Sequence, residues 1–151
     1  MFKKHFYALP NTVLIGTVFV LTLDRLFKNL SLHYWNDKPV FIFKYLALVF
    51  SKNYDISFSI TTFLNPLYLI LPIFILLIGF LFYSLQKKHF IEASMLFLIV
   101  AGASSNLFDR FVYGYVIDYI SVPFFTVFNL ADALICIGVI LISWKTLNTK
   151  N

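Results

Sequence analysis

Long apolar runs separated by short polar stretches dominate this chain, and four of the runs are long enough to cross a lipid bilayer. A membrane-spanning helix needs about 20 mostly apolar residues. The runs cover about residues 9–23, with a continuation through Asp24-Arg25-Leu26-Phe27, and then about residues 63–85, 90–108 and 122–144. The pattern therefore predicts four transmembrane helices, of which the second is the clearest.

The connection from Asp24 to Thr62 has a different pattern, which indicates strands rather than a fifth span. Residues 53–61 alternate polar and apolar with a period of two, as in a half-buried strand. Residues 40–50 are rich in β-branched and aromatic side chains and follow the turn signal Asn36-Asp37-Lys38-Pro39. We expect a small antiparallel β-sheet in this connection, resting on the outer membrane surface. The fold class is then an all-α integral membrane protein with that sheet between spans one and two, and residues 1–151 form a single domain.

The composition agrees with a membrane protein. Hydrophobic residues make up 60% of the 151 residues and charged residues only 13%, with a mean hydropathy of +0.84, whereas about a quarter of the residues in a soluble domain are charged. The net charge of +5 comes from short Lys clusters between the apolar runs, such as Lys87-Lys88. Such clusters flank membrane spans, so we expect no nucleic-acid partner.

The orientation in the membrane follows only weakly from charge. Four spans place both termini on one side, and that side carries six Lys or Arg residues against six on the other. Because Lys3-Lys4 and Lys87-Lys88 lie in a very short tail and a very short loop, we expect both termini in the cytoplasm. No small-residue cleavage site follows the first run, so we expect that span to be retained.

Polar residues that carry chemistry gather toward one face of the membrane. Charged groups at membrane depth cost about 2.5–3.5 kcal/mol on insertion scales and indicate function. Gly102, Asn106 and Arg110 are spaced four apart and share a face of span three, and Asn129 and Asp132 share a face of span four. A glycine at 102 would allow close approach of another backbone or of substrate.

Asp118 lies in the connection between spans three and four, which is only about a dozen residues long, so it cannot lie far from Asp132. Two carboxylates brought together with partial desolvation do not both ionise easily, and the pair holds a single proton near neutral pH. The ionised carboxylate can then take a proton from water while the protonated one polarises a scissile carbonyl. The pair titrates as a unit, so base and acid are not assigned individually.

Three motifs resemble those of the lipoprotein signal peptidase family, also called signal peptidase II, along nearly the whole chain. The first is Asn106-Leu107-Phe108-Asp109-Arg110 followed by Val116-Ile117-Asp118, and the second is Phe128-Asn129-Leu130-Ala131-Asp132. The third is Asp24 near the outer end of the first span, with Lys28 four residues later. Any one of these motifs would be weak, but their order within a four-span chain is specific.

The resemblance implies a bacterial inner-membrane aspartic endopeptidase that removes signal peptides just before a diacylglyceryl-modified cysteine. Catalysis then falls to Asp118 and Asp132. The resemblance further implies prolipoprotein substrates and globomycin-type inhibitors as partners. We expect contacts with membrane lipids, an active site toward the extracytoplasmic face and a chain that acts as a monomer. Residues expected to bind substrate or support the pair are Asn53, Gly102, Asn106, Arg110 and Asn129, with structural support from Asp24 and Asp109.

The chain departs from the family's usual pattern in the outer region. Where the family has Asn-x-Gly-x-Ala-Phe, this chain has Asn53-Tyr54-Asp55-Ile56-Ser57-Phe58, so Asp55 replaces glycine and Ser57 replaces alanine. Ser105 stands where a glycine often precedes the asparagine. These differences affect the expected shape of the substrate cradle more than the aspartate pair.

Other interpretations of the same residues remain open. Asp132 could be an ordinary acid at a helix N-terminus, Asp118 an exposed loop acid, Arg110 an interfacial residue and Asn53 a turn cap. The acids and amides could form a proton or cation relay in a small transporter, or the chain could be an assembly factor without chemistry. A serine–lysine protease is disfavoured because Lys87 and Lys88 belong to the opposite membrane face from Ser104 and Ser105, and Lys28 to another span. A presenilin-like protease would have Gly-x-Gly-Asp before its acid, where this chain has Tyr115-Val116-Ile117-Asp118.

Neither a metal nor an organic cofactor is expected. The three histidines are scattered without metal-ligand spacing, and the only cysteine, Cys136, lies within an apolar run. An aspartate pair and water are sufficient for the chemistry described above.

Overall fold

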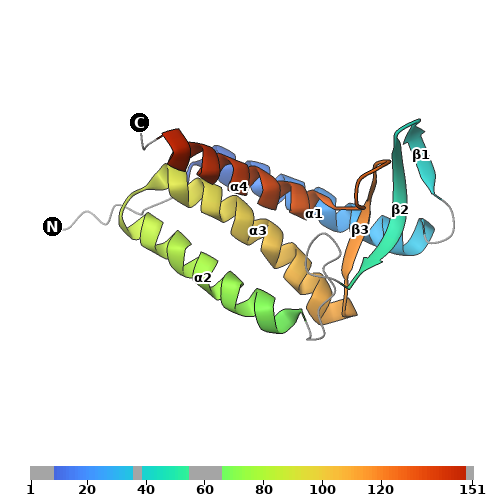
Figure 1. Cartoon of the computed structure of the whole chain (residues 1–151), viewed down its shortest axis with the longest axis horizontal. Coiled ribbons are helices and arrows are strands. Elements are labelled where there is room, and N and C mark those ends of the chain that lie inside the picture. Colours follow the sequence, from blue (N-terminus) through green and yellow to red (C-terminus); the bar gives the residue numbers. More distant parts are fainter. Residues whose placement is uncertain (1–8, 36–38, 55–65, 149–151) are drawn as a thin grey trace.

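The computed structural model describes residues 9–35, 39–54 and 66–148, and within them four helices run alongside one another with a small sheet across one end (Figure 1). The start of the first helix, the turn between the second and third, and the end of the fourth lie at the opposite end (Figure 1). The helices are α1 (Asn11–Tyr34), α2 (Leu67–Gln86), α3 (Phe90–Tyr113) and α4 (Leu130–Asn148), and the strands are β1 (Val40–Phe43), β2 (Leu46–Asn53) and β3 (Val116–Ser121).

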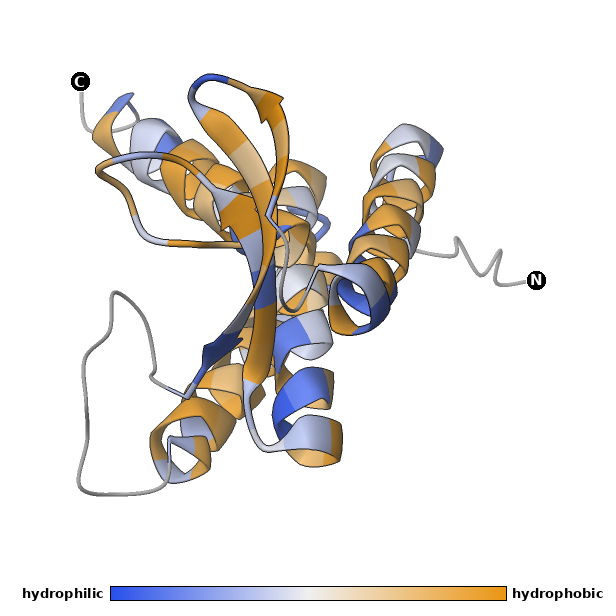
Figure 2. Ribbon diagram, turned by 90° about the vertical axis from the view of Figure 1, so that its right-hand side faces the viewer, coloured by the Kyte–Doolittle hydropathy of each residue, from blue (hydrophilic) through white to orange (hydrophobic). Residues whose placement is uncertain are grey.

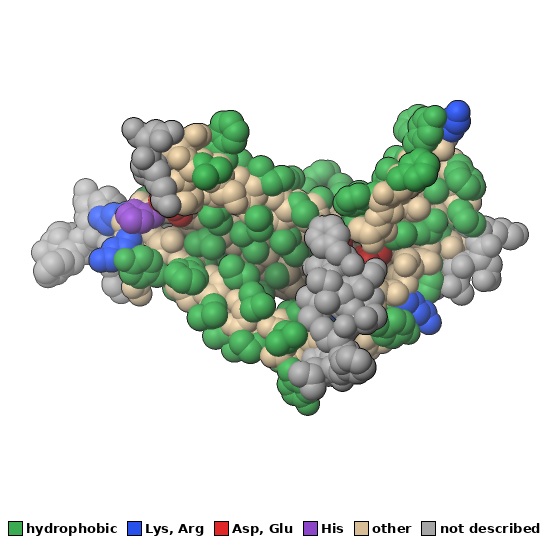
Figure 3. All heavy atoms as spheres, in the orientation of Figure 1, with side chains coloured by type: hydrophobic (Ala, Val, Ile, Leu, Met, Phe, Trp, Pro, Cys, Tyr) green, Lys and Arg blue, Asp and Glu red, His purple; other side chains and the backbone are tan. Residues whose placement is uncertain are grey.

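The helices expose apolar side chains and bury polar ones. Among the large side chains of α1, Ile15 and Phe19 are 68% and 63% exposed. Figure 3 shows a largely hydrophobic surface along the middle of the helices, with basic side chains toward the ends. Such a surface is stable in lipid, where the polar groups must find partners inside the protein. The buried residues of α1 are Thr17, Asp24, Lys28 and Ser31.

Three helices in the described ranges, α2, α3 and α4, are long and apolar enough to cross a membrane. Together with the exposed apolar surface, they make the chain an integral membrane protein. The remaining helix, α1, has 24 residues, and its second half carries Asp24, Arg25 and Lys28. Its role as a fourth span therefore stays a prediction.

Gly114 ends α3 and directs the chain into the sheet. It adopts a left-handed conformation with φ of 81°, and its N–H donates to the carbonyl oxygen of Arg110 at 3.1 Å. Glycine is favoured at this position because it has no Cβ to clash. Only Tyr115 separates this turn from β3, so the position of β3 is closely tied to the end of α3.

The sheet is antiparallel with the order β1-β2-β3. Viewed from the sheet end, its strands cross in front of the helices (Figure 2). β1 is exposed along its length, whereas Val116 to Tyr119 of β3 are buried. In the pairing of β2 with β3, Asn53 lies opposite Val116 and Ser51 opposite Asp118.

The strands predicted within residues 40–50 are confirmed, but confining the sheet to the connection between the first two helices was wrong. Its third strand, β3, comes from the connection between α3 and α4. Because Val116, Ile117, Asp118 and Tyr119 are all buried, both faces of β3 are covered and the period-two alternation that marks a half-buried strand is absent. The alternating pattern at 53–61 begins at the last residue of β2, and its residues 55–61 lie outside the described ranges.

Several helix boundaries differ from those of the apolar runs. α1 continues to Tyr34 and α3 to Tyr113, beyond the predicted ends. The predicted start of the fourth span at 122 was wrong, because α4 begins at Leu130. The preceding segment folds back on β3 instead: the N–H of Phe128 donates to the Ile120 carbonyl at 3.0 Å, and the N–H of Ile120 donates to the Phe128 carbonyl at 2.8 Å. An apolar run can therefore belong to an exposed loop as well as to a span.

Candidate active site

Asp132 lies in the first turn of α4, where Asn129 caps the helix. The N–H of Asp132 donates to Oδ1 of Asn129 at 2.9 Å, and the N–H of Asn129 donates to Oδ2 of Asp132 at 3.2 Å. This reciprocal arrangement is that of a capping box, which fixes both side chains relative to the helix start. It leaves Oδ1 of Asp132 available for contacts across the bundle.

Asp118 lies in β3 and its side chain is buried. Its Oδ1 accepts a hydrogen bond from Nδ2 of Asn129 at 2.6 Å, and its Oδ2 accepts one from Nδ2 of Asn53 at 2.9 Å. The strand register explains the second contact: Asn53 lies opposite Val116, two residues from Asp118, and alternate residues of a strand share a face of the sheet. The pairing of β2 with β3 therefore brings the side chains of Asn53 and Asp118 together.

The environment of Asp118 favours a carboxyl group that titrates near neutral pH. Burial raises the pKa of Asp118 to about 7, and the negative charge of Asp132 acts in the same direction. The hydrogen bonds from Asn53 and Asn129, and the charge of Lys28, oppose the shift. A group with such a pKa can hold or release a proton under physiological conditions.

Asn106 on α3 links Asp132 to Asn129, the residue that contacts Asp118. Its Nδ2 donates to Oδ1 of Asp132 at 2.7 Å, and its Oδ1 accepts from Nδ2 of Asn129 at 3.2 Å. Asn129 in turn contacts Asp118. Two amides thus bridge the aspartates, and each aspartate receives at least two hydrogen bonds.

Asp132 faces a cavity of about 460 Å³ that is also lined by Asn53, Asn106 and Arg110. The guanidinium of Arg110 interacts electrostatically with Asp132 and Asp118. The rest of the cavity wall is formed mainly by apolar side chains, so the cavity has a polar end and an apolar wall. They include Ile70, Phe74 and Leu77 of α2, Phe125 and Phe128 of the loop before α4, and Ile135 and Cys136 of α4.

The predicted site residue Gly102 contacts α4 and not the open cavity. A Cβ at this position would lie 2.4 Å from the carbonyl oxygen of Ala131 and 2.9 Å from a side-chain carbon of Ile135. The absence of a side chain therefore lets α3 approach the backbone of α4 next to Asp132. Of the two roles predicted for Gly102, this contact favours support of the aspartate pair.

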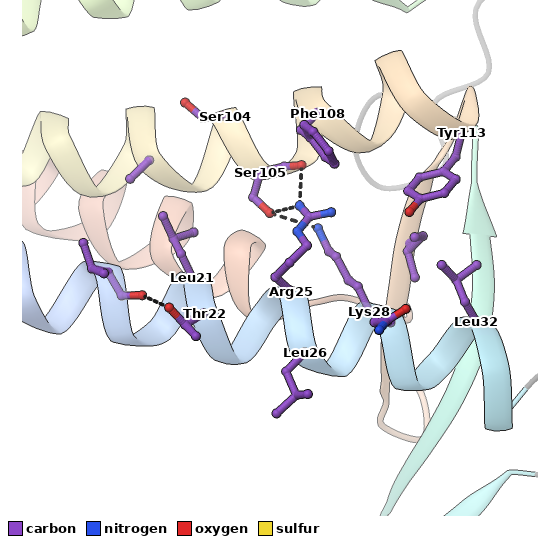
Figure 4. A pocket seen from close by; sticks show the side chains of 14 residues that line it. Leu21, Thr22, Arg25, Leu26, Lys28, Leu32, Ser104, Ser105, Phe108 and Tyr113 are labelled. Atoms are coloured by element: carbon purple, nitrogen blue, oxygen red, sulfur yellow. Dashed lines mark hydrogen bonds between the residues drawn. The ribbon is translucent and has the colours of Figure 1, made fainter.

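A buried ion cluster lies behind the pair. Lys28 forms ion pairs with Asp24 at 3.1 Å and with Asp109 at 2.7 Å, and Arg25 forms one with Asp109 at 2.6 Å. Figure 4 shows Arg25 and Lys28 reaching from α1 toward Ser105 on α3, beside a second hollow of about 840 Å³. The cluster joins α1 to α3, and it contains Asp24 and Asp109, for which a structural role is predicted.

The cluster also holds the start of α4. The first N–H groups of a helix have no partner within it, and here the N–H of Leu130 donates to the Tyr119 hydroxyl at 3.2 Å and that of Ala131 to Oδ1 of Asp24 at 3.3 Å. The Tyr119 hydroxyl donates to Oδ1 of Asp24 at 3.0 Å. Burial raises the pKa of Tyr119 far above its ordinary value, so the hydroxyl remains a donor. Asp132 thus lies on a helix end that α1 and β3 both anchor.

Sequence reasoning did not assign roles to Tyr119, Ser105 or Arg25. Ser105 donates to Oδ2 of Asp24 at 2.7 Å and accepts from Nη2 of Arg25 at 2.7 Å. It therefore fills a structural role where the family often has glycine. Arg25 had a detectable signal, because it is a charged residue in the first apolar run. Ser105 had one in its departure from the family's glycine, whereas the hydroxyl group of Tyr119 had none. The departures at Asp55 and Ser57 lie outside the described residues.

Comparison with known proteins decides the family. Residues 16–148 match the family described as signal peptidase (SPase) II. The chain belongs to the signal peptidase II family. It is 34% identical to the lipoprotein signal peptidase of Thermodesulfovibrio yellowstonii, over 88% of this chain and 92% of that protein. It is 37% identical to the lipoprotein signal peptidase of Caldicellulosiruptor bescii, over 89% of each.

A solved structure described as a bacterial membrane enzyme is similar over 100% of this chain and 94% of its own, with a TM-score of 0.82 and 26% identity. A second, also described as a bacterial membrane enzyme, gives a TM-score of 0.76 over 97% of each chain. The arrangement of helices and sheet is therefore that of known membrane enzymes. Membership of the signal peptidase II family implies a peptidase that takes part in lipoprotein processing.

Proposed function

We propose that the chain is an intramembrane aspartic endopeptidase that removes the signal peptide from diacylglyceryl-modified prolipoproteins, cutting just before the lipidated cysteine. The observation that carries the proposal is the pair Asp118 and Asp132, bridged by the amides of Asn106 and Asn129. Asp132 also lines a cavity with a polar end and an apolar wall, which suits a substrate that is part peptide and part lipid.

In the proposed reaction the pair shares one proton. The carboxylate removes a proton from water, which attacks the scissile carbonyl, while the protonated carboxyl donates to the carbonyl oxygen. The resulting tetrahedral intermediate collapses with proton transfer to the leaving amine, and the pair returns to its singly protonated state. We propose that Asn53 and Arg110, which line the cavity beside Asp132, hold the substrate backbone. No metal or organic cofactor is needed.

We propose that the substrate enters sideways from the bilayer between α2 and α4. In the described ranges both helices pack against α3, but no Cα atom of α2 lies within 8 Å of one in α4. Phe74 of α2 and Cys136 of α4 line the cavity between them. A photoreactive group on the substrate acyl chain should therefore crosslink to these two helices. Crosslinks confined to the strands β1 and β2 would contradict this route.

The proposed placement in the cell follows the family and the predicted topology. We propose a single-domain, monomeric protein of the bacterial inner membrane, with α1 as the fourth span, both termini in the cytoplasm and the sheet and aspartate pair toward the extracytoplasmic face. Globomycin-type inhibitors should then compete with substrate for the cavity. Reporter fusions to the end of α4 and to the β1–β2 turn would test the orientation.

Cleavage of a diacylglyceryl prolipoprotein by the purified protein tests the proposal directly. Wild type is compared with Asp118→Asn and Asp132→Asn, each checked for equal folding by its thermal unfolding curve. We expect cleavage by the wild type and its loss in both variants. Normal cleavage by both variants would exclude the aspartate pair and favour a relay or an assembly role, and a wild type that cuts nothing would exclude the proposed substrate.

A further inference from the structure

The side chain of Lys28 is 1% exposed and reaches from α1 to α3 (Figure 4). It forms ion pairs with Asp24 and Asp109. The ammonium group also donates to Oγ of Ser105 at 3.3 Å. A further bond runs from Nζ to Oδ1 of Asn106 at 3.1 Å. This bond connects the ion cluster to the aspartate pair.

The contact helps to fix which way the amide of Asn106 faces. Its Oδ1 accepts hydrogen bonds from Lys28 and from Asn129, so its Nδ2 is turned toward Asp132 and donates at 2.7 Å. A flipped amide would place N–H groups against two donors and an oxygen against a carboxylate, and an amide nitrogen accepts no hydrogen bond. With Lys28 in place, only one orientation satisfies all three contacts.

We propose that Lys28 is a positioning residue, which holds the Asn106 amide with its N–H toward Asp132. Its buried positive charge also keeps the aspartate pair from taking up a second proton near neutral pH. This inference rests on the proposed aspartic peptidase function. Other charged or titratable groups also surround the cluster and the pair in the described residues. They are Asp24 and Arg25 on α1, Asp109 and Arg110 on α3, Asp118 and Tyr119 on β3 and Asp132 on α4.

The test measures kcat and KM for cleavage of a synthetic diacylglyceryl prolipopeptide by the full-length Lys28→Met protein across the pH range. We expect kcat at neutral pH to fall by about tenfold or more, because the hydrogen bond from the charged Lys28 to Asn106 is lost. KM should change little. Both limbs of the pH profile should move upward by roughly one unit, because removing a nearby positive charge favours protonated carboxyl groups.

Arg25→Met is the matched control. It removes a cation from the same helix and breaks an ion pair with the same Asp109, but the side-chain bonds of Arg25 go to Asp109 and Ser105 and not to Asn106. A loss of stability alone would affect both variants without moving the pH limbs. A displaced profile in Lys28→Met but not in Arg25→Met therefore supports the proposal.

A double-mutant cycle with Asn106→Ala tests the route through the amide. If Lys28 acts through Asn106, Lys28→Met should reduce kcat much less in the Asn106→Ala background than in wild type. Additive losses together with unmoved pH limbs would overturn the proposal. If wild type fails to cleave, or Asp118→Asn and Asp132→Asn cleave normally, the proposed function fails instead.

If Lys28→Met does not fold, the double variant Lys28→Met/Asp24→Asn is used in its place, because it removes one charge of each sign from the cluster. Asp24→Asn alone is then the reference. The upward displacement of the pH limbs is expected in the double variant relative to that reference. Failure of the double variant to fold while the reference folds would assign Lys28 a structural role only and would also overturn the proposal.

Discussion

Asn129 donates its side-chain N–H to Oδ1 of Asp118 at 2.6 Å, although the two residues lie on opposite sides of the loop that leads into α4. The carbonyl oxygen of the same amide accepts the backbone N–H of Asp132 at 2.9 Å. One side chain therefore sets the position of both carboxyl groups. Because reversing the amide would lose both bonds, the geometry of the pair is established before any substrate binds.

The first prediction concerns pH. Burial, followed by the charge of Asp132, raises the pKa of Asp118 to about 7, and the proposed reaction needs one protonated carboxyl in the pair. We expect kcat/KM to fall by about tenfold per pH unit above about pH 7, as that proton is lost. Initial rates with a diacylglyceryl prolipopeptide would measure this, and rates that stay constant to pH 9 would contradict it.

The same raised pKa affects stability with a defined sign. The folded state holds the Asp118 proton more tightly than the unfolded state, whose pKa is near the ordinary 3.8. This contribution to the free energy of unfolding is fully present below that value and is lost as pH rises through about 7. Asp118→Asn should remove this part of the pH dependence of thermal unfolding, which provides a check independent of activity.

The second prediction concerns Asn53, which donates to Oδ2 of Asp118 at 2.9 Å. Asn53→Ala removes a hydrogen bond to a charged group, which is worth about 1.5–3 kcal/mol, so we expect kcat/KM to fall by roughly tenfold or more. The hydrogen bond lowers the pKa of Asp118, and its loss should move the alkaline limb of the profile upward.

Asn29→Ala is a suitable control for Asn53→Ala, because Asn29 is exposed on α1 and does not line the cavity beside Asp132. It should retain both the wild-type rate and the wild-type pH profile. Equal losses in the two variants would mean that the effect of Asn53→Ala is not specific to Asp118.

The sequence was sufficient to place the helices, apart from the start of the fourth, and to single out the candidate residues, because the signals involved are local. Apolar runs follow from the thickness of the bilayer, and the spacing of Asn106 and Arg110 or of Asn129 and Asp132 follows from helix geometry. A short connection kept Asp118 near the start of the fourth helix. The contacts from Asn106 and Asn129 to the aspartates are consistent with those expectations.

The contacts that join distant segments were not predictable in the same way. The pairing of β2 with β3 depends on a register between strands far apart in sequence, and nothing local to residues 116–121 indicates it. The same holds for Tyr119, whose hydroxyl meets Asp24 across 95 positions. An apolar-looking tyrosine in a buried strand gives no sign that its polar end has a specific partner.

The third prediction concerns the close approach of α3 and α4. In Gly102→Ala the new Cβ would meet the carbonyl oxygen of Ala131 at 2.4 Å, so the helices must separate next to Asp132. Overpacking costs about 1–3 kcal/mol, and we expect a lower melting temperature together with reduced kcat.

Gly79→Ala on α2 is the matched control, because a Cβ there meets nothing within 4 Å. It should leave activity unchanged and keep or slightly raise stability, since alanine favours a helix by up to about 1 kcal/mol over glycine. Thermal unfolding and cleavage assays on both variants decide the matter. A Gly102→Ala protein with wild-type stability and rate would refute the packing role.

The fourth prediction concerns the anchor of α4. Tyr119→Phe removes a hydroxyl that donates to Asp24 and accepts the N–H of Leu130. A buried group left without its partner costs about 1–3 kcal/mol, so the melting temperature should fall. Because Asp132 lies two residues after Leu130, kcat should fall as well. Tyr68→Phe, at a tyrosine 71% exposed on α2, should change neither quantity. A Tyr119→Phe protein that loses stability but keeps the wild-type kcat would show that the start of α4 holds its position without this anchor.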